Sequence, residues 1–306
     1  MATHADRNAF SKRHDMKTLL VTILCLGATT ALADSVHKSV DAKEDGFVTI
    51  SNTAGSIEVR GWSRNQVDVQ ADLGRGADEL VVERDDNEVR VIVKSPRGAS
   101  HRASSDLVVR VPEKSSVKVT GVSADISVEN VRGAQRLQTV SGDLDTEAYA
   151  ADIDAQTVSG DLSIDGDGHE LRASVSTVSG DVDVQNVRGE IEAGSVSGDL
   201  IVVDSAFRHA SLETTSGDIV YHAGLLGDGR LDVSTINGDL DIEFAGKLSA
   251  RFDIETFNGS IRNCFGPEPV RTSQYAPGRE LAFTEGAGDA RVTIRTLNGD
   301  LRLCKD

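Results

Sequence analysis

The 306-residue sequence is poor in aromatic residues, which make up 4% of the chain and include one tryptophan. Proline is also scarce, with five residues, whereas glycine is frequent, with 29. The length would allow two ordinary domains, but these frequencies favour a single β-rich body. Enzymes that act on polysaccharides usually offer aromatic platforms to the sugar rings, so the composition gives that class of activity little support.

Basic residues are outnumbered by acidic ones, 32 to 49, and the formal net charge is −17. A field of this sign disfavours nucleic acid and anionic lipid surfaces as partners, and it keeps the chain soluble. Solvated outer faces of a slender β body are a sufficient explanation of the charge.

Long hydrophobic runs are absent after residue 33. Residues 1–33 have the features of a signal peptide, with Met16 as the expected true start, an apolar core over 18–28 and a small-residue cleavage site at 31–33. The apolar core is too short to span a membrane. The sequence therefore predicts a periplasmic or secreted protein with no membrane span after signal removal.

One phrase, Thr-Val-Ser-Gly-Asp-Leu, recurs with small variations from about residue 115 to the end. We call the glycine position of the phrase the anchor. Successive anchors are 18 to 21 residues apart, except for a last step of 40. A period near twenty is typical of a solenoid, whose coils contact only their neighbours. The anchors are Ala124 (in the glycine position), Gly142, Gly160, Gly180, Gly198, Gly217, Gly238, Gly259 and Gly299.

Each position of the repeat has its own residue type. The residues two after and five before the anchor are apolar in all nine repeats, whereas those three and five after it are mostly polar or charged. This alternation predicts one strand on each side of the anchor. The glycine then lies at a corner, where its backbone freedom is expected to be needed. Coils stacked at the strand spacing would join the apolar positions into a continuous core.

The repeat predicts an all-β fold, a right-handed parallel β-helix of about nine to ten short coils over residues 113–306. A left-handed hexapeptide-repeat helix also has about eighteen residues per coil, but it needs an aliphatic residue every six positions, which this chain lacks. Residues 34–112 are strand-rich without the phrase and are predicted to form an N-terminal β cap over the open end. Because Gly55-Ser56-Ile57 resembles the repeat corner, this block can also be a first coil with a long insertion. A proline- and glycine-containing segment at about 265–290 is predicted to be an insertion within one coil.

Several segments, within the repeat and before it, carry a resemblance to a known family. They are the opening at 55–62, the strand end at 109–112, the run of Ser-Gly-Asp corners and the closing phrase at 296–301. With these the chain resembles the bacterial β-strand-repeat proteins labelled "putative adhesin", a family of unknown function, over nearly all of residues 45–304. The resemblance implies the β-repeat fold, and it transfers no functional residue.

Aspartate follows the anchor in seven consecutive repeats, from Asp125 to Asp239; Ser260 interrupts the run and Asp300 resumes it. Stacked carboxylates about 5 Å apart repel each other by roughly 1 kcal/mol in water. A divalent cation between coils would relieve this repulsion. The favoured interpretation needs no metal, because each carboxylate can accept hydrogen bonds from the backbone of its own corner. The weak candidates for metal ligands are Asp143, Asp161, Asp181, Asp199 and Asp218.

No catalytic or cofactor-binding residue can be assigned. The histidines show no metal-ligand spacing, and only His209 and His222 could share a neighbourhood, in adjacent coils. The sequence therefore predicts an exported non-enzymatic β-solenoid that serves as an adhesin-like structural or interaction surface in the cell envelope. Its partner would be an envelope protein or a glycan. The alternative is a carbohydrate-active β-helix enzyme, a polysaccharide lyase or hydrolase with its catalytic groups in a groove.

Two further predictions concern single positions. Ile201 and Val220 fall in an outward position of neighbouring coils with Val203 close by, so this patch is either covered by a loop or contacts a partner. Cys264 and Cys304 each lie five residues after an anchor. If the segment between them is one coil with an excursion, they stack within disulfide reach and fasten the last coil; two coils would place them about twice as far apart. Export permits the bond.

Overall fold

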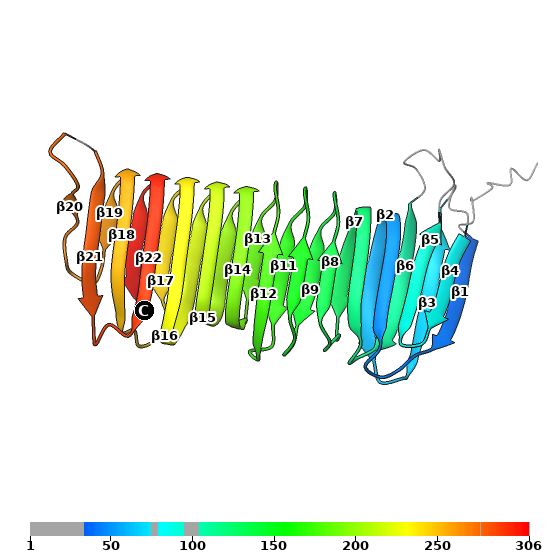
Figure 1. The fold of residues 1–306 in the computed structure, drawn as a ribbon. Coiled ribbons are helices and arrows are strands. Elements are labelled where there is room, and N and C mark those ends of the chain that lie inside the picture. The colour runs from blue at the N-terminus through cyan, green and yellow to red at the C-terminus, as the bar shows by residue number, and fades with distance from the viewer. Residues whose placement is uncertain (1–33, 75–78, 95–103, 276, 306) are drawn as a thin grey trace, which may run out of the picture. The chain divides into compact units, whose positions relative to one another are not determined.

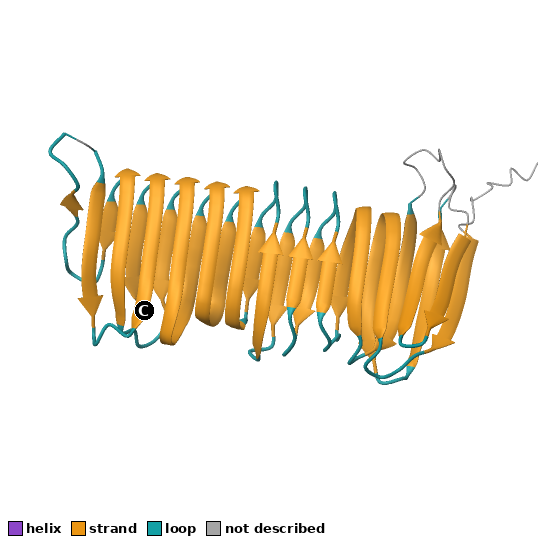
Figure 2. Ribbon diagram, in the orientation of Figure 1, coloured by secondary structure: helices purple, strands orange, loops and turns teal. Residues whose placement is uncertain are grey.

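The computed structural model describes residues 34–74, 79–94, 104–275 and 277–305. The predicted signal peptide, residues 1–33, lies outside the described residues. The described chain belongs to one compact unit and contains strands but no helix (Figure 2). Most neighbouring strands pair in parallel, and each coil places one strand before the corner and one strand after it, as the alternation predicts.

The N-terminal strands pair in both directions. They are β1 (Asp34–Asp41), β2 (Phe47–Trp62), β3 (Gln66–Leu73), β4 (Glu79–Asp85), β5 (Glu88–Lys94) and β6 (Ser105–Pro112). β2 pairs in parallel with β5 and β6, and on its other side with β7 (Ser116–Glu129). β1, β3 and β4 pair antiparallel and lie beyond these coils. Residue 112 is therefore no structural break, because β2 is itself a coil with Gly55 opposite Ala124.

The central coils follow in chain order. Their strands are β8 (Gln135–Gln138), β9 (Leu144–Ala148), β10 (Ile153–Gln156), β11 (Leu162–Gly166), β12 (Glu170–Ser176), β13 (Val182–Gln185), β14 (Arg188–Ser197), β15 (Leu200–Ser216), β16 (Ile219–Asn237) and β17 (Leu240–Phe244). Parallel register brings equivalent repeat positions together, with Leu144, Leu162, Val182 and Leu200 opposite one another in turn. Identical positions therefore form rows that cross every coil.

The C-terminal coils do not follow chain order. The remaining strands are β18 (Ala250–Asn258), β19 (Ile261–Asn263), β20 (Val270–Arg271), β21 (Arg279–Glu285), β22 (Ala290–Asn298) and β23 (Leu301–Lys305). β22 pairs in parallel with both β16 and β18, and β23 pairs with both β17 and β19. The last coil in the sequence is thus inserted between two earlier coils, as Figure 1 shows for the red β22 between the orange and the yellow strands. β21 pairs antiparallel with the outer side of β18.

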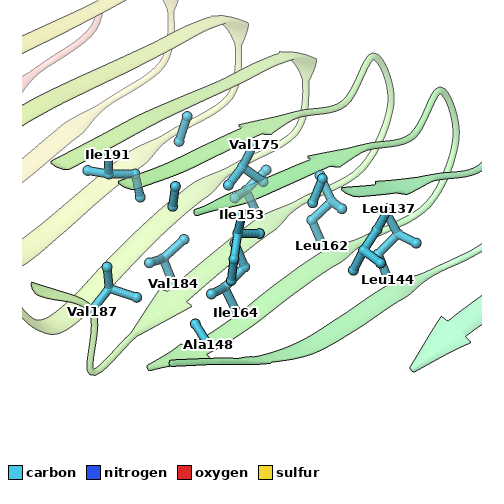
Figure 3. Close-up of a cluster of buried hydrophobic side chains, with 14 of the residues drawn as sticks. Leu137, Leu144, Ala148, Ile153, Leu162, Ile164, Val175, Val184, Val187 and Ile191 are labelled. Atoms are coloured by element: carbon cyan, nitrogen blue, oxygen red, sulfur yellow. The ribbon is translucent and has the colours of Figure 1, made fainter. Parts of the chain in front are cut away.

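The predicted aliphatic interior is confirmed. The residues two after the anchor are at most 6% exposed in all nine repeats, and Figure 3 shows this core in the central coils. The few aromatic residues gather near the C-terminal coils, where Phe252 stacks on Phe283 at 4.4 Å and Tyr221 contacts Phe244 at 5.8 Å. The aromatic residues of the core therefore form a series of ring contacts that runs from Phe207 on β15 to Phe283 on β21.

The physical reason for the anchor glycine differs from the expected one. A Cβ at Gly198 would lie 1.9 Å from the carbonyl oxygen of Gly180, and a Cβ at each of the other repeat glycines would lie 1.9–2.2 Å from the carbonyl oxygen of the anchor in the neighbouring coil. Among them only Gly160 has a positive φ. Close approach between coils, and not backbone conformation, excludes other side chains here. Ala124, the one exception to glycine at this position, lies opposite Gly55 of β2.

The second corner of the coil uses a different device. The segments 130–133 and 186–189 share the sequence Asn-Val-Arg-Gly. Asn130 and Asn186 both have a φ of 56°, in the left-handed region that asparagine tolerates better than most residues. The sequence echo therefore marks the same turn in two different coils.

Candidate functional site

The most regular surface feature is the corner edge, which we define as the positions from two before to one after each anchor. A buried threonine or serine three before the anchor fixes this edge. Thr139 donates its hydroxyl to the carbonyl of Ala124 at 3.0 Å, and Thr214 does the same to Gly198 at 3.2 Å. Because the residue three before the anchor points inward, the side chain that follows it points outward.

The outward side chain two before the anchor is large and apolar in eight coils. These residues form the apolar ridge, and each is 45–50% exposed: Val122, Val140, Val158, Val178, Val196, Ile236, Leu297 and Phe257. Thr215 occupies the position in the remaining coil. Monomeric proteins rarely expose contiguous apolar surface of this kind without a binding role. Consideration of the inward positions alone does not identify the ridge. The valine of the repeated phrase is its signal in the sequence.

The aspartates after the anchors form a hydrogen-bonded ladder beside the ridge. The Asp161 backbone N–H donates to Asp143 Oδ1 at 3.0 Å, and the Asp199 N–H donates to Asp181 Oδ1 at 2.8 Å. The same contact runs from Asp125 through to Asp300 at 2.7–3.1 Å. The expectation that each carboxylate bonds its own corner is therefore wrong, because the donor belongs to the next coil.

The apparent interruption of this ladder is an effect of chain order. Asp300 lies directly after Asp239 in space, and Ser260 closes the series by donating both its N–H and its hydroxyl to Asp300 Oδ1. At the other end Ser56 makes the same two contacts to Asp106. A serine thus occupies this position in the coil that β21 borders and in the first coil of the sequence.

Asp143, Asp161, Asp181, Asp199 and Asp218 all lie in this ladder, each spending one oxygen on a backbone donor. Among the residues that the structure describes, no group of three or more histidine, cysteine, aspartate or glutamate side chains is arranged to hold a metal ion. Metal binding by these five residues stays a weak prediction.

Substitutions of one ladder aspartate separate the effect of its charge from the effect of its hydrogen bond on stability. Asp199→Asn keeps an acceptor oxygen and removes a charge, so we expect unfolding free energy equal to the original or higher by about 0.5 kcal/mol. Asp199→Ala removes the acceptor of the Asp218 N–H and should cost about 1 kcal/mol. Urea denaturation measures both. If calcium, against sodium at matched ionic strength, raises the melting temperature of the original and not of Asp199→Asn, the ladder is a cation site after all.

The corner edge is acidic as well as apolar. Between four before and three after each anchor, the seven repeats from 120–127 to 234–241 contain no lysine or arginine. Asp183, just outside the ladder and opposite Ile201, has a pKa raised above its ordinary value by burial. The ridge therefore lies against a row of carboxylates with no basic side chain interleaved.

The predicted patch lies on the strands after the corner. Ile201 is opposite Val220, Val203 is opposite His222, and all of these side chains are half-buried. Partner binding at Ile201, Val203 and Val220 stays a prediction. His209 is opposite Arg230, on the strands before the corner, so the two histidines do not form a shared site.

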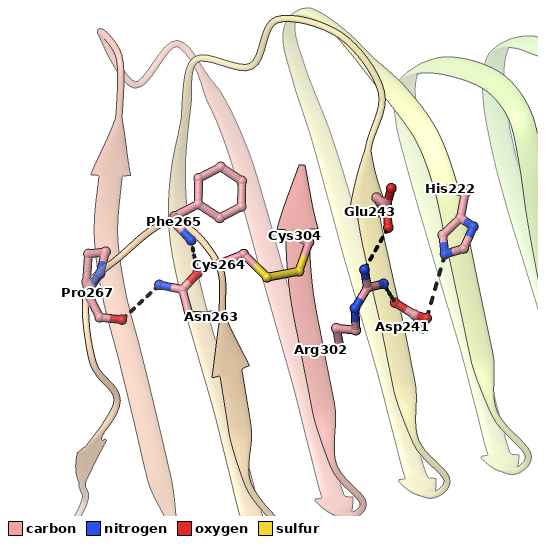
Figure 4. The surroundings of a disulfide bond; sticks show 9 residues. All are labelled: His222, Asp241, Glu243, Asn263, Cys264, Phe265, Pro267, Arg302 and Cys304. Carbon is pink, nitrogen blue, oxygen red and sulfur yellow. Dashed lines mark hydrogen bonds and ion pairs between the residues drawn. A yellow bond between two sulfur atoms is a disulfide. The ribbon is translucent and has the colours of Figure 1, made fainter. Parts of the chain in front are cut away.

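The disulfide lies at the C-terminal coils. Cys264 and Cys304 are bonded with their Cα atoms 4.9 Å apart, and the Cys264 N–H donates to the Leu303 carbonyl. β19 and β23 are direct neighbours, so the two cysteines lie one strand spacing apart, as the single-coil prediction for the intervening segment requires. The bond does not fasten an end coil formed by the last residues, since β23 lies inside the stack. In Figure 4 it joins β23 to β19, while Arg302 reaches across to Asp241 and Glu243.

These features define an all-β repeat protein whose strands pair mainly in parallel around a recurring Ser-Gly-Asp corner. Residues 47–223 match the model of the Toastrack DUF4097 family, a family of unknown function. Because this match covers more than half of the sequence, the chain belongs to that family. The predicted resemblance to a β-repeat family of unknown function is thereby confirmed.

Several solved structures are similar to the chain at low sequence identity. A putative adhesin from Parabacteroides merdae is 9% identical with a TM-score of 0.50, and the match covers 88% of this chain and 95% of that one. A putative adhesin from Bacteroides fragilis (11% identical, TM-score 0.45, covering 88% and 96%) and a putative lipid binding protein from Parabacteroides distasonis (13%, 0.44, 88% and 96%) are also similar. No match to a curated protein was found. Within the described residues, no helix has the length and apolar character needed to cross a membrane.

Proposed function

We propose that the chain is an exported, non-enzymatic, right-handed β-solenoid of nine to ten coils whose corner edge is an adhesin-like interaction surface in the cell envelope. The observation that carries this proposal is the apolar ridge. Eight large apolar side chains occupy one repeat position and remain half exposed. A surface role explains the outward valine that recurs in the phrase better than folding does, because the core needs only the inward positions.

The chemistry of the edge favours a protein partner over a glycan. The ridge offers valine and isoleucine side chains, which pack against apolar side chains, and no exposed aromatic platform before Phe257. The adjoining aspartate ladder attracts lysine and arginine on a partner and repels a second copy of the same edge. We therefore infer a partner that presents a short apolar edge flanked by basic residues.

Two observations support export. The signal-peptide features of residues 1–33 predict it, and the only two cysteines beyond residue 33 form a disulfide, as oxidising compartments allow. A periplasmic or secreted location follows as part of the proposal. The adhesin names of structural neighbours agree with it and add no residue-level support.

Removing the apolar side chains at the centre of the ridge should strongly weaken binding to the partner without unfolding the protein. We expect residues 34–306 carrying Val158→Ser, Val178→Ser and Val196→Ser to be retained at least about tenfold less on envelopes of the producing cells, since buried apolar anchors dominate such interfaces. The measurement is a saturation binding curve with labelled protein, together with the melting temperature. Val270→Ser is the matched control, because Val270 is 57% exposed and lies outside the ridge.

Two results would overturn the proposal. Equal retention of the triple variant and the Val270→Ser control would remove the ridge as the binding surface. Release of reducing sugar from envelope polysaccharide by the unmodified protein would favour the carbohydrate-active alternative instead.

A further inference from the structure

Three arginines from separate coils meet in one row on the strands before the corner. Arg230 on β16 is opposite Arg291 on β22, and Arg291 is in turn opposite Arg251 on β18. The insertion of β22 between β16 and β18 creates this row. All three side chains are exposed, and a fourth, Arg295, follows Arg291 on the same side of β22.

Such a row is electrostatically unfavourable by itself. Like charges directly opposite on neighbouring strands destabilise a sheet, and this sheet belongs to a chain with net charge −17. Elsewhere the same row is built in the usual way, with Arg172 opposite Glu190 and paired to it at 2.6 Å. The three adjacent arginines are therefore unusual in an acidic chain, and they differ from the arginine–glutamate pairing found elsewhere in the same row.

Nearby carboxylates neutralise only part of this charge. Arg230 pairs with Asp232 at 2.9 Å, and Arg295 lies 3.7 Å from Asp253 and 3.6 Å from Glu255. Within the described part of the chain, Arg291 and Arg251 have no carboxylate within 4.0 Å. The row thus keeps the guanidinium groups of Arg291, at its centre, and of Arg251, beside it, available for a ligand.

A groove lies over the row. It has a volume of about 410 Å³ and is lined by the four arginines, Thr293 and Asp253. Phe252 also borders it but is 3% exposed, so no aromatic face is open for stacking against a sugar or a base. The groove can recognise charge and hydrogen-bond acceptors, and little else.

We propose that this groove, here called the arginine groove, binds a phosphate monoester dianion. Guanidinium groups match the oxygens of phosphate with paired N–H donors. A single tetrahedral dianion placed over Arg291 brings several acceptor oxygens within reach of its neighbours in the row, and it offsets their mutual repulsion. The phosphate can belong to a lipid headgroup or to a free phosphorylated molecule. This site does not depend on the apolar ridge, which lies at the corner.

The test uses residues 34–306 and two probes. Inorganic phosphate is titrated by calorimetry, and vesicles of phosphatidylcholine with phosphatidic acid are tested by co-sedimentation, against vesicles with the phosphodiester phosphatidylglycerol at equal charge. We expect saturable binding of inorganic phosphate or of the phosphatidic acid vesicles, weakened at least tenfold by Arg291→Gln and by Arg251→Gln. Arg172→Gln is the matched control, since Arg172 belongs to the same row but is already paired with Glu190.

The outcomes of the two binding assays distinguish a lipid headgroup from a free phosphorylated molecule as the source of the phosphate. Binding of phosphatidic acid vesicles without binding of free phosphate supports a lipid headgroup, and binding of free phosphate supports a free phosphorylated ligand. No saturable binding of either probe, equal binding of both vesicle types, or unchanged binding by Arg291→Gln overturns the proposal. Melting temperatures verify that each variant is folded, and the ridge variant should keep its phosphate binding.

Discussion

Replacing Leu200 by aspartate should destabilise residues 34–306 by roughly 4 kcal/mol or more. Leu200 is 0% exposed and lies between Val182 and Ile219 in the row two after the anchor. A carboxylate there would be buried among aliphatic side chains from the coils on both sides, and the lost leucine would leave a cavity as well. The measurement is the urea midpoint followed by circular dichroism.

The neighbouring residue supplies the control. Ile201 belongs to the same strand, points outward and is half-buried, so Ile201→Asp should change stability by no more than about 1 kcal/mol. Similar losses for the two variants would mean that the inward and outward positions of the repeat have been assigned wrongly.

Removing the disulfide should cost about 4 kcal/mol in the chain-entropy model. Cys264 and Cys304 are 40 residues apart in sequence and bond across β19 and β23. Without the bond, the loop between them is unconstrained in the unfolded chain, and the coil of β18 and β19 is held to the stack by its strand pairing alone. The variant Cys264→Ser with Cys304→Ser shows this loss as a lower urea midpoint.

Two comparisons make this prediction specific. The unmodified residues 34–306 under reducing conditions should match the double variant, because both lack the same covalent link. Denatured but unreduced protein from an oxidising compartment should show no free thiol, whereas two titratable thiols per chain would contradict the bond.

The repeat positions were predictable because each one has a fixed local environment. An aliphatic residue two after the anchor is required wherever a coil is stacked on both sides. Glycine is required wherever two anchors lie so close that a Cβ would clash. Sequence alternation reports the first constraint directly. It reports that glycine is needed but not why, since a tight turn and a close approach between coils select the same residue.

The order of the C-terminal coils could not be predicted, for the same reason. Since all coils present equivalent rows, any of them fits beside any other, and the register gives no preference for chain order. Ser260 was one local clue. It replaces aspartate in the coil that comes last in space, where no further corner is stacked beyond it. The apolar ridge was missed because valine is typical of a strand interior by residue type, although the alternation places Val178 outward after the inward Thr177.

The inserted position of β22 and β23 also determines how the protein responds to mechanical load. A force applied at Lys305 pulls along β23, whose hydrogen bonds to β17 and to β19 then lie in shear and must break together. A force at Asp34 instead acts on β1, which within the described residues pairs with β3 alone and can be peeled away one bond at a time. The molecule therefore has a weak end and a strong end, and a tether attached at the C-terminus would transmit tension into the interior of the stack.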